Sequence, residues 1–197
     1  TPGTLKSSTA TVGGLQTIRP SAPAVPTNFT KGCSSNTTQQ LTWSAPATGT
    51  FDGYMLVVRE GGLAPHAVTA INASTASPNL NYGASPTFGS TAPLSRILYV
   101  GLGTSVTVTG LTPGVNYYYE LYAYKNNGAS ASVYSTATST TQVAGLSNVI
   151  NPSATALTSA ATINWTNPNA GCYDEILVVV TSASGITFSP TGDGTAY

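Results

Sequence analysis

The side chains that most often perform acid–base catalysis are scarce in this chain. His66 is its only histidine, and Glu60 is the only carboxylate near it in the sequence. A Ser–His–carboxylate triad needs a histidine held against a buried acid, so we expect His66 to be a hydrated loop residue. The acidic residues are spread along the chain, which does not favour the carboxylate pair of a glycosidase. They are Asp52, Glu60, Glu120, Asp174, Glu175 and Asp193. The sequence therefore predicts no enzyme active site.

A metal site and a bound cofactor are not expected either. The segment Thr191 to Thr195, TGDGT, has the composition of a loop and could offer oxygen atoms to calcium. Its single carboxylate, Asp193, is far short of the usual calcium ligand set.

The composition excludes several classes of partner. Charged residues make up 6% of the 197 residues and cancel to zero net charge, whereas ordinary soluble domains carry about 25%. The few lysines and arginines are scattered, so no basic patch for nucleic acid or an anionic membrane is predicted. No apolar run is long enough to span a membrane. A charge-poor surface rich in Ser and Thr is typical of secreted or cell-surface repeats.

The element that organises the chain is the segment Ser105 to Tyr124. Apolar or aromatic residues alternate on each side of Leu111-Thr112-Pro113-Gly114, which predicts two strands joined by a tight corner. Pro113 fixes its own φ and Gly114 tolerates a positive φ. Between residues 23 and 142 turn signals recur at short intervals and no helical period occurs. We therefore predict an all-β sandwich.

The two faces of the predicted strands have different expected roles. One face supplies the predicted core: Phe29, Leu41, Trp43, Tyr54, Leu56, Val58, Val106, Val108, Leu111, Tyr117, Tyr119, Leu121, Ala123 and Val133. The other face carries Tyr118, Tyr122 and Tyr124, which form a candidate binding face, because clustered tyrosines are favoured contacts in protein and glycan recognition. They are also ordinary cross-strand pairs under a covering loop, and residues 60–103 could be that loop. Both interpretations stay open.

The second half of the chain repeats the first. Aligning Trp43 with Trp165 without a gap places Asp52 on Asp174, and residues 56–58 then fall on residues 178–180. The second copy stops at Tyr197, before any equivalent of the segment 105–124. Half a sandwich leaves open sheet edges, so we expect the natural chain to continue.

This repeat predicts four regions. They are residues 1–22, a lead-in or the end of a preceding domain; 23–142, a complete repeat; 143–150, a linker; and 151–197, the N-terminal half of a second repeat.

Two groups of sequence segments resemble those of a known family. They are SVTVTGLTPG at 105–114 followed by Tyr117 and Tyr118, and CYDEILVV at 172–179 with GDGTAY at 192–197. Both are similar to the fibronectin type III repeats of large secreted and cell-surface proteins of Gram-negative bacteria with type IX secretion. The resemblance implies an immunoglobulin-like, fibronectin type III β-sandwich, with one complete repeat and the first half of a second.

The resemblance also implies roles for two groups of residues. The spacing of Leu111, Pro113 and Tyr117 resembles the tyrosine corner, in which a tyrosine hydroxyl bonds to backbone just upstream. In a tandem of such repeats, the loops holding Cys33 and Cys172 would face the same junction, which implies an inter-repeat disulfide. Two unrelated thiols, or partners elsewhere in the natural chain, are the alternative.

The function that the resemblance implies is a non-catalytic spacer or adhesion module, located outside the cell or on its surface after export across the outer membrane. The alternatives are an accessory module of a secreted hydrolase and a type IX secretion substrate captured with its export machinery. The expected partners are other domains of the same longer chain, a surface glycan or protein, and type IX secretion components.

Overall fold

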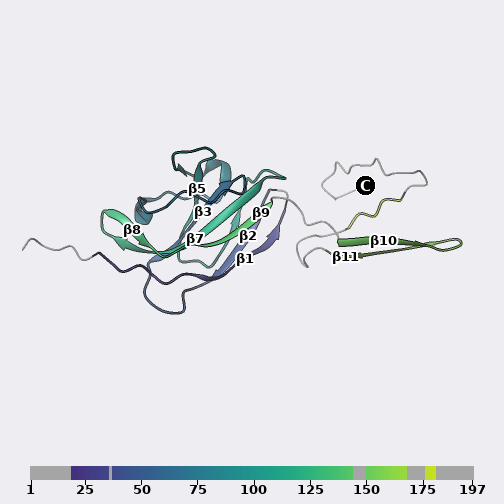
Figure 1. The fold of residues 1–197 in the computed structure, drawn as a ribbon, viewed down its shortest axis with the longest axis horizontal. Helices are drawn as coiled ribbons and strands as arrows, with labels where there is room; N and C mark the ends of the chain where they lie inside the picture. The colour runs from purple at the N-terminus through teal and green to yellow at the C-terminus, as the bar shows by residue number, and fades with distance from the viewer. Residues whose placement is uncertain (1–18, 36, 144–149, 168–175, 181–197) are drawn as a thin grey trace, which may run out of the picture.

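The computed structural model describes residues 19–35, 37–143, 150–167 and 176–180, and residues 27–143 form a β-sandwich (Figure 1). The three-stranded sheet has the order β1-β2-β6, with β1 at Thr27–Ser34, β2 at Gln39–Ser44 and β6 at Ser105–Val108. All of its pairs are antiparallel. This architecture confirms the predicted all-β sandwich.

The second layer is a six-stranded antiparallel sheet. Its order is β4-β5-β3-β7-β8, with β4 at Thr87–Phe88, β5 at Ser95–Gly101, β3 at Gly53–Glu60, β7 at Asn116–Asn127 and β8 at Ser130–Tyr134. The last strand of the sandwich, β9 at Thr138–Val143, pairs with the first half of β7, and β8 pairs with the second half. The long strand β7 therefore pairs along one side with β3 and along the other with both β8 and β9.

The core between the two sheets follows the predicted alternation. On β7 the odd-numbered side chains from Tyr117 to Ala123 point inward and are fully buried. Trp43 lies between aromatic rings, with centroid distances of 5.6 Å to Tyr54 and 6.2 Å to Phe29. Every predicted core residue except Val133 belongs to this cluster, and Val133 is buried outside it.

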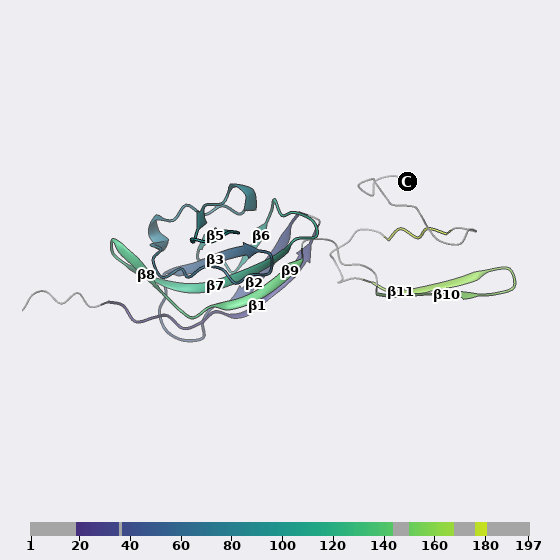
Figure 2. The same cartoon turned by 45° about the horizontal axis from the view of Figure 1, so that its top comes forward.

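Residues 61–94, between β3 and β5, form a third layer that we call the strap. It contains two single-turn 3-10 helices, η1 at Ala73–Thr75 and η2 at Tyr82–Ala84, together with β4. Figure 2 shows the strap on the side of the six-stranded sheet that faces away from β1 and β2. Val68 and Ala73 of the strap pack with residues from the outer face of that sheet to form a second buried cluster. The sheet members are Met55, Val57, Ile97, Tyr122 and Tyr124.

One end of the strap is bonded to β8. Ile71 O accepts from the Ser132 N–H at 3.0 Å and from the Tyr134 hydroxyl at 3.0 Å. The Ala73 N–H donates to Ser132 Oγ at 2.9 Å, and Asn72 Nδ2 donates to Gly128 O at 3.3 Å. The backbone of this part of the strap is therefore satisfied by the sheet, as buried backbone must be.

The other end of the strap closes the side of the sandwich beside β6. The Thr109 N–H donates to Leu80 O at 2.9 Å, and the Tyr82 N–H donates to Thr109 O at 2.8 Å. The Tyr82 ring enters the sandwich core edge-on to Tyr117, with the centroids 5.0 Å apart. The long connection is thus an integral part of the domain.

The described residues after β9 form an antiparallel hairpin of β10, at Ile150–Ala156, and β11, at Ala161–Thr166. Trp165 lies on β11 and is partly exposed. Residues 168–175 and 181–197 lie outside the described residues. The predicted second half-repeat and the four predicted regions stay predictions.

Candidate binding surface

The corner between β6 and β7 fixes where the tyrosine-rich strand begins. Gly110 and Gly114 adopt φ values of 68° and 78°, which L side chains rarely adopt. The buried Tyr117 accepts a hydrogen bond at its hydroxyl from the Thr112 N–H, 2.9 Å away. Leu111 is buried and Pro113 is exposed. The structure therefore brings the Tyr117 hydroxyl to the backbone just upstream of its strand.

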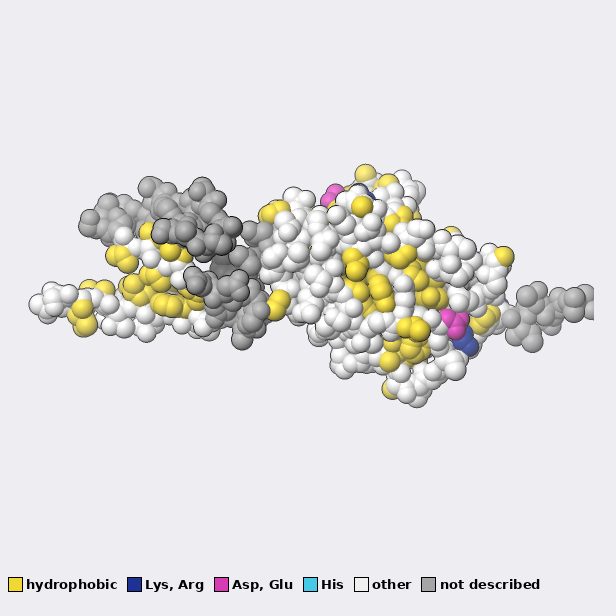
Figure 3. All heavy atoms as spheres, turned by 180° about the vertical axis from the view of Figure 1, so that it is seen from behind, with side chains coloured by type: hydrophobic (Ala, Val, Ile, Leu, Met, Phe, Trp, Pro, Cys, Tyr) yellow, Lys and Arg dark blue, Asp and Glu magenta, His cyan; other side chains and the backbone are white. Residues whose placement is uncertain are grey.

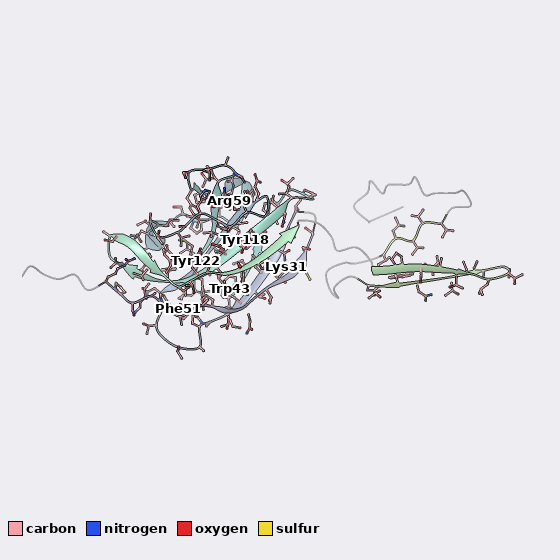
Figure 4. The ribbon with its side chains drawn as sticks, viewed as in Figure 1. Lys31, Trp43, Phe51, Arg59, Tyr118 and Tyr122 are labelled. Carbon is pink, nitrogen blue, oxygen red and sulfur yellow. The ribbon has the colours of Figure 1, made fainter. Side chains whose placement is uncertain are left out.

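The candidate face of Tyr118, Tyr122 and Tyr124 is not an open tyrosine surface. Tyr122 is 9% exposed and Tyr124 is 6% exposed, because both lie in the buried cluster under the strap. Tyr118 is half-buried, and its hydroxyl donates to Ser139 Oγ at 3.1 Å. Figure 4 shows Tyr118 and Tyr122 along β7, with Tyr122 nearer to β8. Tyr122 and Tyr124 therefore pack under a covering segment, which was the second of the two interpretations.

Tyr122 and Tyr134 form an aromatic pair at the junction of β7 and β8. Their ring centroids are 5.9 Å apart and the rings are edge-on. Burial raises the pKa of Tyr122, and its hydrogen bond to the Glu120 carboxylate adds to that effect. Burial also raises the pKa of Tyr134 to about 12. Both rings are therefore neutral at physiological pH, with their hydroxyls committed to protein acceptors.

A small recess opens beside this pair, between the strap and β8. Its volume is about 190 Å³, and its floor is formed by buried residues that include Val68, Ser132 and Ser135. The exposed residues Arg19, Ala67 and Thr69 lie at its mouth. The sequence does not predict this site, because its residues come from four separate stretches, 19, 67–69, 122 and 132–135, with no shared period. The recess and the pair beside it are the candidate binding surface.

His66 holds the strap in place, so the expected hydrated loop histidine is wrong in part. The half-buried His66 ring is hydrogen-bonded through Nδ1 to Ser95 Oγ at 2.8 Å and through Nε2 to Thr91 Oγ1 at 3.0 Å. Glu60 lies elsewhere, with its carboxylate accepting from the Tyr82 hydroxyl at 3.1 Å. The two side chains therefore do not form a catalytic pair.

Arg59 fastens the strap where it joins the sheet. Its Nε donates to Pro93 O at 2.8 Å and its Nη1 to Ala64 O at 3.1 Å, while its Nη2 donates to Thr91 O at 3.3 Å. Carbonyls from near the first and near the last residue of the strap thus share one guanidinium. This use of its donors makes Arg59 a structural residue.

The remaining predicted site residues are only partly described. Cys33 is half-buried near the end of β1, and Cys172 lies outside the described residues, so their pairing stays a prediction. Within the described part of the chain, no three His, Cys, Asp or Glu side chains come together as a metal site would need. No helix in the described ranges is long and apolar enough to cross a membrane.

Comparison with known proteins gives one family match. The model of the fibronectin type III domain family matches residues 24–141, which is more than half of the chain. No curated protein matches the chain.

Several solved structures are similar at low identity. A segment of two fibronectin type III domains from chicken tenascin is 19% identical, covers 74% of this chain and 63% of its own, and has a TM-score of 0.41. A computationally redesigned β-sandwich protein is 19% identical over 64% of this chain and 94% of its own, with a TM-score of 0.41. A structure described as a myokine is 12% identical over 63% and 99%, with a TM-score of 0.40.

Proposed function

Because the chain belongs to the fibronectin type III family, we propose that it is a non-catalytic module of an extracellular or cell-surface protein and acts there as a spacer. Modules of this fold host many functions, so the argument for a spacer must come from this chain's own surface.

The strap is the observation that supports this proposal. It covers the outer face of the six-stranded sheet, and its backbone is bonded to β8 at one end and to Thr109, just after β6, at the other. Edge strands and exposed sheet faces are where unrelated chains add on, and here that face is filled from within the same module. Charged side chains show at only a few places on the sandwich in Figure 3. Such a module can separate its neighbours while attracting few partners itself.

Limited proteolysis of the native chain tests the integrity that a spacer needs. We expect residues 27–143 to survive as one fragment, because cleavage requires a segment to open and the strap is tied at both ends. The same digestion in denaturing urea provides the control for accessible cleavage sites. Early cutting within residues 61–94 under native conditions would contradict the proposal.

The context of the module is a further part of the proposal. The sequence resemblance supports export by type IX secretion within a longer chain, joined to other domains through residues 143–150. Mass spectrometry of the natural polypeptide, from culture medium and cell surface, would find further repeats and a sorting domain. A hydrolase domain in the same polypeptide would instead make these repeats its accessory module. Recovery from the cytoplasm alone would contradict export.

The same digest, performed without reduction, tests the junction between repeats. We expect one peptide pair joined through Cys33 and Cys172, which would restrain the linker by closing a loop of more than 100 residues. Loop-closure entropy puts the upper limit of that stabilisation at roughly 4 to 5 kcal/mol. Equal numbers of free thiols before and after reduction would contradict the predicted disulfide.

A further inference from the structure

The recess between the strap and β8 has room for one side chain. Its volume is about 190 Å³, whereas sites for drug-sized ligands have about 300 to 1,000 Å³. Val68 and Val133 contribute apolar surface, and the rings of Tyr122 and Tyr134 form an aromatic wall. Edge-on contacts between aromatic rings are favourable, so this wall suits an aromatic occupant.

The serine and tyrosine hydroxyl groups that line the recess already form hydrogen bonds within the protein. Ser132 Oγ accepts from the Ala73 N–H, and the Tyr134 hydroxyl donates to a strap carbonyl. Ser135 Oγ accepts from the Ala123 N–H at 3.1 Å and donates to Thr136 O at 2.8 Å. The hydroxyls of a sugar ring would give up their hydrogen bonds to water on entering the recess, and burying them without new partners costs free energy. The chemistry of the floor therefore favours an apolar group.

Arg19 gives the mouth of the recess a positive charge. It is exposed, and among the described residues no hydrogen bond or ion pair engages its guanidinium. The nearby Glu120 carboxylate accepts a hydrogen bond from the Tyr122 hydroxyl and does not line the recess. A guanidinium presents paired donors that match the two oxygens of a carboxylate.

We propose that the recess binds the C-terminal residue of a peptide, with an aromatic or large aliphatic side chain inside and its terminal carboxylate on Arg19. A C-terminal residue of this kind carries an apolar group and an anion a few bonds apart, which is what a one-side-chain recess with a cation at its mouth can hold. This inference goes beyond the spacer function, which does not depend on it.

The test is an NMR titration of the isotope-labelled chain with three small probes. N-acetylphenylalanine has both the ring and the carboxylate, N-acetylphenylalaninamide has the ring alone, and glucuronate has the carboxylate on a sugar. We expect N-acetylphenylalanine to shift the amide signals of Val68 and Ser132 to Ser135. The amide probe should bind about tenfold more weakly, since it lacks the charge-assisted bonds. Glucuronate should produce no shift.

Two matched variants identify the cation responsible. Arg19→Gln should lower the affinity for N-acetylphenylalanine to that for the amide probe, while Lys31→Gln, which removes another exposed cation, should change neither. Equal melting temperatures would show that both variants are folded. Binding of N-acetylphenylalanine that is absent, or that is unchanged in Arg19→Gln, would overturn the proposal, as would stronger binding of glucuronate. None of these outcomes changes the proteolysis pattern on which the spacer proposal is tested.

Discussion

Three consecutive tyrosines on β7 should respond differently to the loss of one oxygen atom. The Tyr117 hydroxyl accepts from the Thr112 N–H at 2.9 Å inside the domain. The Tyr118 hydroxyl donates to Ser139 Oγ at 3.1 Å at an exposed position. The Tyr119 hydroxyl is buried and has no hydrogen-bond partner among the described residues. Substitution by phenylalanine removes only the hydroxyl in each case.

The expected change in the free energy of unfolding follows from the hydrogen bond that each hydroxyl makes or lacks. Tyr117→Phe should lower the free energy of unfolding by about 1 kcal/mol, the usual contribution of one internal hydrogen bond. Tyr118→Phe should change it by less than about 0.5 kcal/mol, as surface changes do. Tyr119→Phe should leave it unchanged or raise it by about 1 kcal/mol, because a buried hydroxyl without a partner costs free energy.

Urea unfolding followed by tryptophan fluorescence measures all three variants under one condition. With an m-value of roughly 2 kcal/mol per molar urea, a change of 1 kcal/mol moves the midpoint by about 0.5 M. The m-values should stay equal, so that midpoints compare directly. A Tyr119→Phe variant that loses more stability than Tyr117→Phe would refute this reasoning, since the Tyr119 hydroxyl would then have a partner.

Three further predictions concern the strap, a close backbone approach and alkaline pH. Arg59→Met removes the donors shared by the strap carbonyls, so limited proteolysis should cut residues 61–94 faster than in the wild type; equal rates would contradict this. Gly53→Ala places a Cβ 3.0 Å from Gly101 O, which should lower stability by roughly 1 to 3 kcal/mol in thermal unfolding, and an unchanged melting temperature would disagree. Burial raises the pKa of Tyr134 to about 12, above the ordinary value of 10, so the folded state holds this proton more tightly. The stabilisation that comes from this tighter proton binding is therefore complete below pH 10 and is lost as the pH rises from 10 to 12. Tyr134→Phe removes the titrating hydroxyl, so it should reduce the slope of the urea midpoint against pH in that window.

The sandwich core could be predicted from the sequence because strands have a period of two. Once Trp43 and Tyr117 are placed inside, alternation assigns their neighbours to a face, and the structure agrees. The corner at Pro113 and Gly114 could be predicted for a similar local reason, since Pro113 fixes its own φ and Gly114 allows the positive φ that the turn needs.

The strap and the recess could not be predicted, because their contacts are not periodic. Tyr82 belongs to the sandwich core and Leu80 packs against that core, yet Tyr82 lies on the single-turn helix η2 rather than on a strand, so strand alternation does not assign its face. Arg19 reaches the recess from before β1, and Tyr134 reaches it from β8. Only the three-dimensional path of the chain brings such residues together.

The anchoring of the strap also bears on the order in which the chain folds. Its bonds to the last part of the sheet join residues that are 56 to 63 positions apart in the sequence. Contacts of such long separation close large loops and form late, so substitutions in these anchors should speed unfolding and leave the folding rate almost unchanged. Until the strap docks, Tyr122 and Tyr124 face water. Each nascent chain therefore passes through a period in which its own strap competes with neighbouring chains for this sheet face.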